Sequence, residues 1–289
     1  MAPFSSLRAT LAQAYPPAPA FTEANAPQAR KMAKAEAVIK MTTEASTSKH
    51  TSGKLKFLHL DLNDLLVVKA AAESFAQQED KLDVLWNNAG TGANAVTIGQ
   101  HTAQDFDHMI GMHCIAVLLF TKLLLPQLRA AAAGGSGKTR VVWTSSALAE
   151  SGSSINGINF DLLDKGMKNR TENYGASKAG TWIPSREFAC RYAKDGIVSV
   201  CLNPGLLKTA SFNGTPAAVM FVLNKVILSG AIYGAYTGLY AGLSPNVTLE
   251  KSGSYTISLI KAGDTKEEEG LDYGNKFWTW CEGKWRSYV

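Results

Sequence analysis

Two side chains in the second half of the chain have the spacing that proton transfer requires. Tyr174 and Lys178 lie four residues apart in the run Tyr-Gly-Ala-Ser-Lys, near the start of a predicted helix, and therefore share one helix face. A free tyrosine has a pKa of about 10, and a neighbouring ammonium favours the phenolate, so such a tyrosine can serve as a general acid or base toward an alkoxide or alcohol. Ser146 ends the preceding predicted strand and could bond the same substrate oxygen. The spacing alone is usually that of a surface pair, so the serine at the strand end is what favours a catalytic site.

Apolar runs alternate with helical patterns along the chain, and these elements must position the three side chains. Strands are predicted at 55–61, 82–87, 140–146, 197–202 and 254–260, and helices at 31–45, 63–78, 103–129, 174–194 and 272–286, with Pro126 bending or breaking the long third helix. Alternating strands and helices indicate βαβ units and a parallel sheet with helices on both faces. Such a sheet holds its site beyond the carboxyl ends of the strands, where Asp61, Asn88–Gly90, Ser146 and Asn203–Gly205 all fall.

Length and composition indicate a single α/β domain and argue against several classes of function. The chain has 289 residues, 46% of them apolar, and a net charge of +5 carried by dispersed Lys and Arg, with no basic run among aromatics that would predict nucleic-acid binding. The four cysteines are far apart and predict reduced thiols in a reducing, cytoplasmic compartment. His108 and His113 fall on different helix faces, so no metal site is expected. The apolar stretch 217–243 contains Asn224, Lys225 and several glycines, which predicts a buried lid helix rather than a membrane span.

A series of short motifs runs in order along nearly the whole chain. They are Tyr15–Pro17, Phe21–Glu23, Leu60–Leu62, Asn87–Gly90, Ser145–Ser146, Tyr174–Lys178, Asn203–Gly205 with Thr209, and Ile232–Thr237. With these motifs the chain resembles the short-chain dehydrogenase/reductase family, and most of all fungal members with a Tyr-Pro-Pro-x-Pro lead-in. The resemblance implies a Rossmann-like, doubly wound parallel sheet in one domain over 1–289, with an extended lead-in at 1–30 and a substrate lid at 206–245.

The resemblance also implies an activity and a role for each matching residue. The chain would be an NAD(P)-dependent oxidoreductase that moves a hydride between nicotinamide and a small carbonyl compound or secondary alcohol. Tyr174 would donate or accept the proton, Lys178 would favour the phenolate and bind the nicotinamide ribose, and Ser146 rather than Ser145 would orient the substrate carbonyl. The other implied cofactor contacts are Asp61 at the adenine, Asn88, Ala89, Gly90, Lys122 on the long helix, and Pro204, Gly205, Leu207 and Thr209 around the nicotinamide.

Three positions near the implied site keep a second interpretation. His113 stands where relatives place an Asn that helps to hold a water of the proton relay. An imidazole can bond a carbonyl or a water instead, so His113 is a further catalytic candidate. The alternative role of Asp61 is to cap a helix, and the alternative role of Asn87 is to tie strands together.

The turn with which the family opens is missing. Family members begin with a strand, a TGxxxGxG turn and a helix whose N-terminus aims backbone N–H groups at the cofactor pyrophosphate. No such motif lies upstream of Leu55, and residues 24–31 pass directly into the helix that would follow the second strand, so a piece of about 30 residues, the size of a βαβ unit, is absent. Strand 55–60 must then pair with strand 82–87 or leave buried edges unpaired. Arg30, as the stub of the second strand, would favour NADP, with NAD as the alternative.

Two functions therefore remain open for this chain. The first is the oxidoreductase, acting on a moderately apolar carbonyl compound because the lid carries Phe212, Phe221, Tyr233 and Tyr236. The second is a catalytically impaired or truncated member that serves as a binding or scaffold protein, because function depends on the site rather than on the fold. The lid aromatics could equally pack in the core or at the face of a homo-oligomer.

Overall fold

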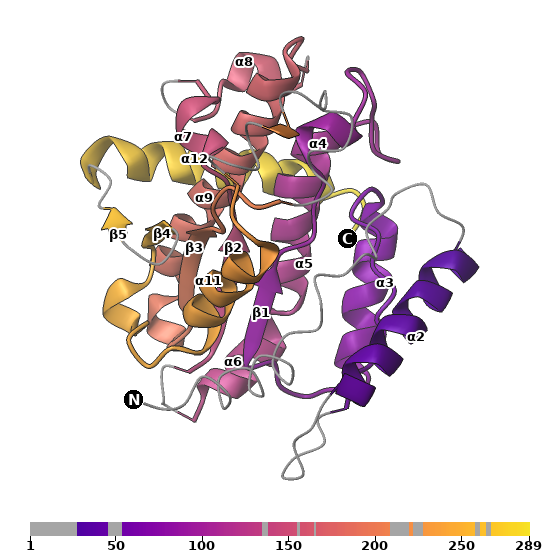
Figure 1. The fold of residues 1–289 in the computed structure, drawn as a ribbon. Coiled ribbons are helices and arrows are strands. Elements are labelled where there is room, and N and C mark those ends of the chain that lie inside the picture. The colour runs from indigo at the N-terminus through magenta and orange to yellow at the C-terminus, as the bar shows by residue number, and fades with distance from the viewer. Residues whose placement is uncertain are drawn as a thin grey trace.

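A five-stranded sheet lies at the centre of the molecule, in the order β1-β2-β3-β4-β5 (Figure 1). β1 (Val84–Asn87), β2 (Arg140–Thr144), β3 (Val198–Asn203) and β4 (Tyr255–Ile257) run parallel, and β5 (Lys261–Gly263) is antiparallel to β4. Every residue of β3 and all but the last of β2 are buried, as expected of continuous apolar strands covered on both faces. The strands predicted at 82–87, 140–146, 197–202 and 254–260 are thereby confirmed, with bounds shifted by a few residues.

The computed structural model describes residues 28–45, 54–134, 138–154, 157–164, 166–208, 220–221, 228–257, 261–263 and 267–289. Most of the predicted lead-in, Thr209 and much of the predicted lid lie outside these residues.

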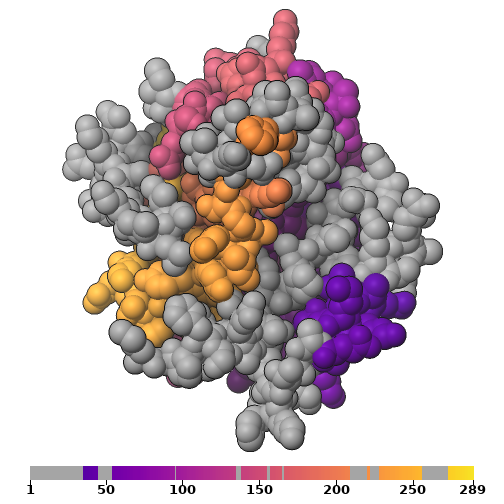
Figure 2. Space-filling model, in the orientation of Figure 1, coloured from indigo at the N-terminus to yellow at the C-terminus, as the bar shows by residue number. Residues whose placement is uncertain are grey.

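Helices cover both faces of the sheet, as the doubly wound fold requires. On one face α11 (Ala231–Leu243) contacts β1, β2 and β3, and the outer side of this helix forms part of the surface seen in Figure 2 (orange). On the other face α9 (Arg170–Tyr192) contacts β2 and β3 and is flanked by α12 (Glu267–Trp285). Alternate residues of β2 serve the two faces, since Val142 packs with the α11 side whereas Val141 and Trp143 pack with the other. The shorter or more peripheral segments are α2 (Gln28–Ala45), α3 (Leu65–Ala76), α7 (Leu148–Ser151), α8 (Phe160–Leu163) and the 3-10 turns Ala93–Ala95, Ala193–Asp195 and Leu249–Lys251.

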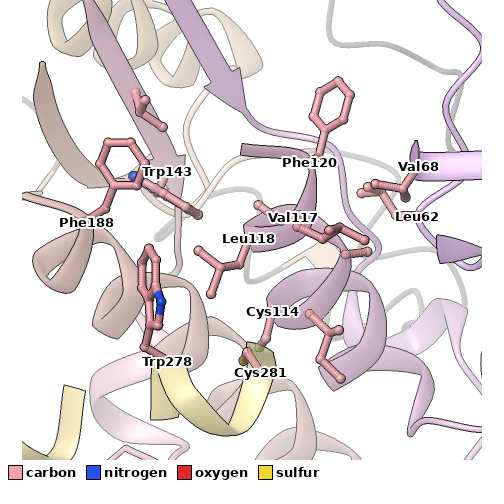
Figure 3. Close-up of a cluster of buried hydrophobic side chains, with 14 of the residues drawn as sticks. Leu62, Val68, Cys114, Val117, Leu118, Phe120, Trp143, Phe188, Trp278 and Cys281 are labelled. Carbon is pink, nitrogen blue, oxygen red and sulfur yellow. The ribbon is translucent and has the colours of Figure 1, made fainter. Parts of the chain in front are cut away.

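The larger core lies between the sheet and the helices of the α9 face (Figure 3). Trp143 of β2, Phe188 of α9 and Trp278 of α12 meet there, with ring centroids 6.1 Å apart for the first pair and 6.4 Å for the second. Phe277, Trp278, Cys281 and Trp285 are all buried, which gives α12 one apolar face at helical spacing. The C-terminal helix predicted at 272–286 is confirmed, and this face explains why it docks on α9.

The long helix predicted at 103–129 is divided into pieces. It comprises α4 (His108–Ile110), a π-helical stretch (Gly111–Ala116), α5 (Val117–Leu123) and α6 (Leu125–Ala132), with 53° between the halves that meet at Leu124. Pro126 lies in the first turn of α6 and accounts for the break, because a proline ring clashes with the preceding turn of a continuous helix. Within the described residues no single helix is long and apolar enough to cross a membrane, although the two halves taken together meet the same test of length and composition.

The strand predicted at 55–61 is absent, and this expectation was wrong. Residues 54–61 form irregular chain between α2 and α3, and Leu58 and Leu60 pack against the larger core instead of joining a ladder. A strand forms only where a neighbour supplies hydrogen bonds, and residues 54–61 pair neither with the open edge of β1 nor with another strand of the described sheet. β1 is consequently an edge strand of the described sheet. Arg30, expected at the end of a second strand, lies within α2.

Candidate active site

Most of the predicted site residues follow the carboxyl ends of β1, β2 and β3, at one edge of the sheet. Asn88 follows β1, and its Oδ1 accepts a hydrogen bond of 3.3 Å from Thr144 Oγ1 at the end of β2. The backbone N–H of Ser145 donates to the carbonyl of Leu202 in β3 over 2.8 Å. The parallel register therefore brings the three strand ends together, as the topology of an open α/β sheet predicts.

The first turns of α9 carry Tyr174 and Lys178 to this edge. Asn169 caps the helix by accepting from the backbone N–H groups of Thr171 and Glu172, over 2.9 and 3.2 Å. Lys178 is buried, its Nζ donates to the carbonyl of Thr144 over 3.2 Å, and the same atom lies 5.7 Å from the centroid of the half-buried Tyr174 ring. The ammonium is thus fixed to the end of β2 and faces the phenol.

The two serines after β2 have different surroundings. Ser145 is buried, and its hydroxyl donates to the backbone carbonyl of Lys178 over 2.8 Å, which ties β2 to α9. Ser146 is half-buried, and its hydroxyl accepts from the backbone N–H of Leu148 over 3.3 Å, so it keeps its own proton to donate. The geometry therefore favours Ser146 over Ser145 as the group that meets a substrate.

His113 lies in the π-helical stretch and joins two parts of the site. Its Nε2 accepts from the backbone N–H of Thr91 over 3.1 Å, and its Nδ1 lies 2.9 Å from Ser177 Oγ. The ring meets Tyr174 edge-on, with centroids 6.0 Å apart. Burial, and after it the Lys178 ammonium, hold the pKa of His113 well below its usual range. The imidazole is therefore neutral at physiological pH.

The loops after β1 and β3 carry the remaining predicted contacts on this edge. A Cβ on Gly90 would lie 2.8 Å from His113 Nε2 and 3.6 Å from Lys178 Nζ, so the missing side chain lets this loop approach both groups. Ala89 and Gly90 are half-buried. Gly205 donates its backbone N–H to Asn203 Oδ1 over 3.0 Å, next to Pro204, and Leu207 forms a bridge with Ser229. Thr209 lies outside the described residues.

Comparison with known proteins identifies the family of this site. A family model described as short chain dehydrogenase matches residues 23–158. Short-chain dehydrogenase/reductase iacJ of Pestalotiopsis fici is 40% identical over 266 residues, which cover 90% of this chain and 81% of that protein. The chain belongs to the short-chain dehydrogenase/reductase family. A short-chain dehydrogenase/reductase of Phomopsis amygdali is 32% identical, with 99% of each chain covered.

Solved structures agree on the fold of this short-chain dehydrogenase/reductase. The NADPH-bound carbonyl reductase from chicken fatty liver superposes with a TM-score of 0.58 at 23% identity, covering 91% of this chain and 94% of that one. RhlG of Pseudomonas aeruginosa, in its NADP complex, gives a TM-score of 0.58 at 19% identity, covering 81% of this chain and 82% of that one. The alignment with the Phomopsis protein extends over 335 positions although this chain has 289 residues, so several dozen residues of that relative have no counterpart here.

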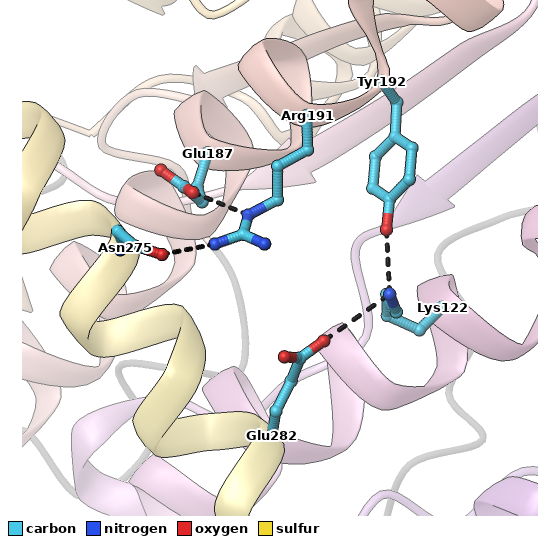
Figure 4. A network of polar contacts seen from close by, with 6 residues as sticks. All are labelled: Lys122, Glu187, Arg191, Tyr192, Asn275 and Glu282. Atoms are coloured by element: carbon cyan, nitrogen blue, oxygen red, sulfur yellow. Dashed lines mark hydrogen bonds and ion pairs between the residues drawn. The ribbon is translucent and has the colours of Figure 1, made fainter.

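The structure does not bring Lys122 to the site of this family member. Its Nζ donates to Tyr192 Oη over 2.8 Å and lies 3.5 Å from Glu282 Oε1, in a network that joins α5, α9 and α12 (Figure 4). Tyr192 lies fourteen residues beyond Lys178 on α9, about 21 Å along the helix axis. The predicted cofactor contact of Lys122 thus has no support in this geometry, and the side chain anchors the C-terminal helix instead. Asn87 likewise donates to Thr121 Oγ1 over 2.8 Å, tying β1 to α5 and not to another strand.

The pyrophosphate end of the family's cofactor groove does not fit the residues present. Before β1 the described residues form the helices α2 and α3 and no strand, so among these residues no strand-turn-helix presents backbone N–H groups to a pyrophosphate. At the start of α3 the N–H groups of Leu65 and Leu66 already bond Gln104 Oε1 and the carboxylate of Asp64, over 3.0 and 2.9 Å. That carboxylate would repel a phosphate. Asp64 also takes the capping role considered for Asp61, whose Oδ1 instead accepts from the backbone and side chain of Asn63, each over 3.1 Å.

Three residues that support the site were missed in the sequence. Tyr255 of β4 donates to the backbone carbonyl of Ser146 over 3.2 Å, while the partners of His113 are the backbone of Thr91 and the hydroxyl of Ser177. Only Ser177 carried a signal, since it lies inside the Tyr-Gly-Ala-Ser-Lys motif. Among the described residues, no group of three or more His, Cys, Asp or Glu side chains is placed to hold a metal ion.

Proposed function

We propose that this chain is an NAD(P)-dependent oxidoreductase that transfers a hydride between nicotinamide and a carbonyl compound or secondary alcohol, with Tyr174 as the proton donor or acceptor. The observation that carries the proposal is the position of the buried Lys178 ammonium, which lies over the Tyr174 ring and bonds the Thr144 carbonyl at the end of β2, the strand that Ser146 follows. These groups are of the types that carbonyl reduction requires.

Each of the three side chains has a distinct part in the proposed reaction. Ser146 donates a hydrogen bond to the carbonyl oxygen and so orients it toward Tyr174. Tyr174 gives its phenolic proton to the oxygen as it becomes an alkoxide, and it takes the proton back in the reverse direction. The Lys178 ammonium, held on the Thr144 carbonyl, stabilises the phenolate by its charge. Its remaining N–H donors are available for ribose hydroxyls.

The nicotinamide end of a dinucleotide fits the residues present, in contrast to the pyrophosphate end. Asn88, Ala89 and Gly90 after β1, and Pro204, Gly205 and Leu207 after β3, would flank the nicotinamide, with Lys178 at the ribose. A bound nicotinamide supplies the hydride, and the chain supplies the proton and the orientation. We propose NADP with NAD as the alternative, because proteins of this fold are found with either, as in the NAD complex of a 3-oxoacyl-[acyl-carrier protein] reductase from Brucella melitensis.

We further propose a small, moderately apolar substrate, a cytoplasmic location and no nucleic-acid or membrane partner. Ile232 and Tyr233 at the start of α11 are 50% and 53% exposed and follow the loop after β3, so an apolar surface adjoins the proposed site. The described cysteines are all free, which suits a reducing compartment. A homo-oligomer would cover part of the same apolar surface.

Cofactor titration of the purified full chain tests this function. NADPH and NADH are added while nicotinamide fluorescence is followed, and turnover is then measured with a panel of apolar ketones and secondary alcohols. We expect enhanced fluorescence with at least one cofactor and loss of nicotinamide absorbance with at least one ketone. Absence of binding at millimolar cofactor would refute the proposal.

A second function has an observation of its own, the missing phosphate-binding turn. A chain that cannot hold the pyrophosphate would act as a binding or scaffold protein of the same fold. Thermal unfolding separates the two, because a ligand at one hundred times its Kd stabilises a protein by about 2.7 kcal/mol, which raises Tm by about 5–10 °C. A Tm unmoved by either cofactor would favour the second function.

A further inference from the structure

The imidazole of His113 is bonded at both ring nitrogens inside the protein. Thr91 donates its backbone N–H to Nε2 over 3.1 Å, and Nδ1 lies 2.9 Å from Ser177 Oγ. Because an amide N–H can only donate, Nε2 must carry a lone pair, and the proton of the neutral ring is on Nδ1 and is donated to Ser177. Ser177 Oγ in turn donates to the backbone carbonyl of Tyr174 over 2.8 Å. One amide thus fixes the direction of the whole chain of hydrogen bonds.

The groups around the ring keep it uncharged. His113 is 2% exposed, and both its burial and the ammonium of Lys178 on α9 lower its pKa, with a smaller contribution of the same sign from His108 on α4. The phenol of Tyr174 meets the ring edge-on, and the Cys114 thiol beside it in the π-helical stretch bonds the Ser177 carbonyl over 3.3 Å. An uncharged ring is required here, since a proton on Nε2 would oppose the N–H of Thr91.

The loop after β1 is shaped to receive this ring. A Cβ on Gly90 would lie 2.8 Å from His113 Nε2, closer than a Cβ atom approaches a neighbour, and 3.0 Å from Cδ2, which is also tight. The same loop has a strand neighbour on one side only, because β1 is an edge strand of the described sheet. The ring therefore supplies a lateral anchor to a loop that has lost the support of a neighbouring strand.

We propose that His113 is a positioning residue that, as an uncharged imidazole protonated on Nδ1, fixes the loop Asn88–Thr91 against the first turns of α9. It would thereby hold the predicted nicotinamide contacts in register with Tyr174 and Lys178. His113 carries no proton in this proposal, because Nε2 is occupied by the amide of Thr91 and the proton on Nδ1 by Ser177. The positioning role rests on the proposed function, whereas the protonation state and the anchoring contact do not.

Nuclear magnetic resonance of chain labelled with 15N-histidine tests the protonation state without any turnover. We expect the His113 signals, assigned by their loss in His113→Gln, to report a proton on Nδ1 and a lone pair on Nε2. This pattern should persist at pH values below the ordinary histidine pKa of about 6.5. A ring protonated on Nε2, or a doubly protonated ring at pH 6, would overturn the proposal.

A double-variant cycle tests the anchoring contact. In the natural chain Gly90→Ala should lower Tm by about 3–6 °C, because the added methyl group collides with the fixed ring. In the His113→Ala background the same change should lower Tm by less than about 1 °C, since the colliding ring is gone. Equal losses in the two backgrounds would contradict the contact. Should the Ala variant fail to fold, His113→Ser provides the same background with a polar side chain.

A pair of amide variants tests positioning against proton transfer once turnover is measurable. His113→Gln keeps an acceptor near the Nε2 position for Thr91, and His113→Asn keeps a donor near the Nδ1 position for Ser177. We expect His113→Asn to raise the KM for NADPH by about 3–10-fold, the effect of one hydrogen bond, with kcat changed less than about 2-fold, and His113→Gln to leave KM near that of the natural chain. A role in proton transfer would instead lower kcat by about 10²-fold or more in both variants and displace its pH profile. If the natural chain shows no turnover, the proposed function fails while the resonance and double-variant tests still decide the anchoring role.

Discussion

The two ends of the expected cofactor groove differ in how many elements hold them. At the nicotinamide end, hydrogen bonds among β2, β3, β4 and α9 hold Lys178 and the segment Ser145–Ser146, and α12 packs against the same α9 that carries Tyr174. At the pyrophosphate end, irregular chain over 54–61 leads into a helix whose first N–H groups are already bonded. The residues proposed for proton transfer depend on strands that are present, whereas the family's phosphate-binding turn depends on a strand that the described residues lack.

Removal of the Tyr174 hydroxyl at the nicotinamide end should have the largest effect on turnover. Tyr174→Phe is expected to lower kcat by about 10²–10⁴-fold, because the forming alkoxide loses its proton donor. The Kd for NADPH should change little, as the ring and Lys178 remain in place. Steady-state kinetics and fluorescence titration measure the two quantities, with Tyr288→Phe after α12 as the matched control. Turnover retained in the Tyr174 variant would contradict the assignment.

The difference in support between the two regions predicts a difference in stability. Trp278 of α12 is fully buried in the larger core, and Trp278→Ala should lower the free energy of unfolding by about 3–5 kcal/mol. Met41 of α2 is 68% exposed, and Met41→Ala should change the same quantity by less than about 0.5 kcal/mol. Urea unfolding of both variants makes the comparison. Similar losses would mean that the N-terminal helix is as firmly built into the core as α12.

The neutral imidazole at the nicotinamide end makes stability depend on pH. The pKa of His113 is lowered in the folded chain, so the unfolded chain binds a proton more readily. The stabilisation is complete above about pH 6.5 and declines as the pH falls below it. In His113→Gln this dependence should become shallower, with a remainder from His108, whose pKa burial also lowers. Urea unfolding between about pH 5 and 8 measures the slopes, and equal slopes would contradict the prediction.

The hydrogen bond from β4 to Ser146 should have a smaller effect on turnover. Tyr255 is buried against Trp182 of α9, with ring centroids 4.9 Å apart, and its hydroxyl bonds the Ser146 carbonyl. Tyr255→Phe keeps the ring and removes one hydrogen bond, which should lower kcat/KM by about 3–10-fold. Kinetics on the variant test this, and Tm should fall by no more than about 4 °C. An unchanged kcat/KM would show that the β4 bond does not position Ser146.

The smallest expected effect is the difference in Kd between NADH and a ligand that occupies only the nicotinamide end of the groove. Reduced nicotinamide mononucleotide lacks the adenosine phosphate half of NADH. If the pyrophosphate end of this chain contributes no anchor, the two should bind with Kd values within about 3-fold of each other, a difference of less than about 1 kcal/mol. Parallel fluorescence titrations give the ratio. A much tighter complex with NADH would reveal an anchor for the second half of the cofactor.

The elements that local pattern controls were predicted from the sequence. Helical periodicity places Tyr174 and Lys178 on one face of α9, and continuous apolar runs produce the buried strands β2 and β3. Pro126 divides the long helix, because a proline ring cannot enter a continuous turn. The absence of the glycine-rich turn was also evident from the sequence alone, since the residues of its motif lie next to one another in the sequence.

Features that depend on partners distant in the sequence were decided by the tertiary structure alone. Residues 55–61 have an apolar composition suited to a strand, but a strand needs a neighbouring ladder, and without one these residues pack as irregular chain. Lys122 was predicted at the cofactor, yet its partners Tyr192 and Glu282 lie far along the chain and hold it elsewhere. The protonation of His113 follows from the amide of Thr91, which only the fold brings to the ring. Local pattern thus fixes which face a side chain lies on, whereas the partner that sets its chemistry is chosen by packing.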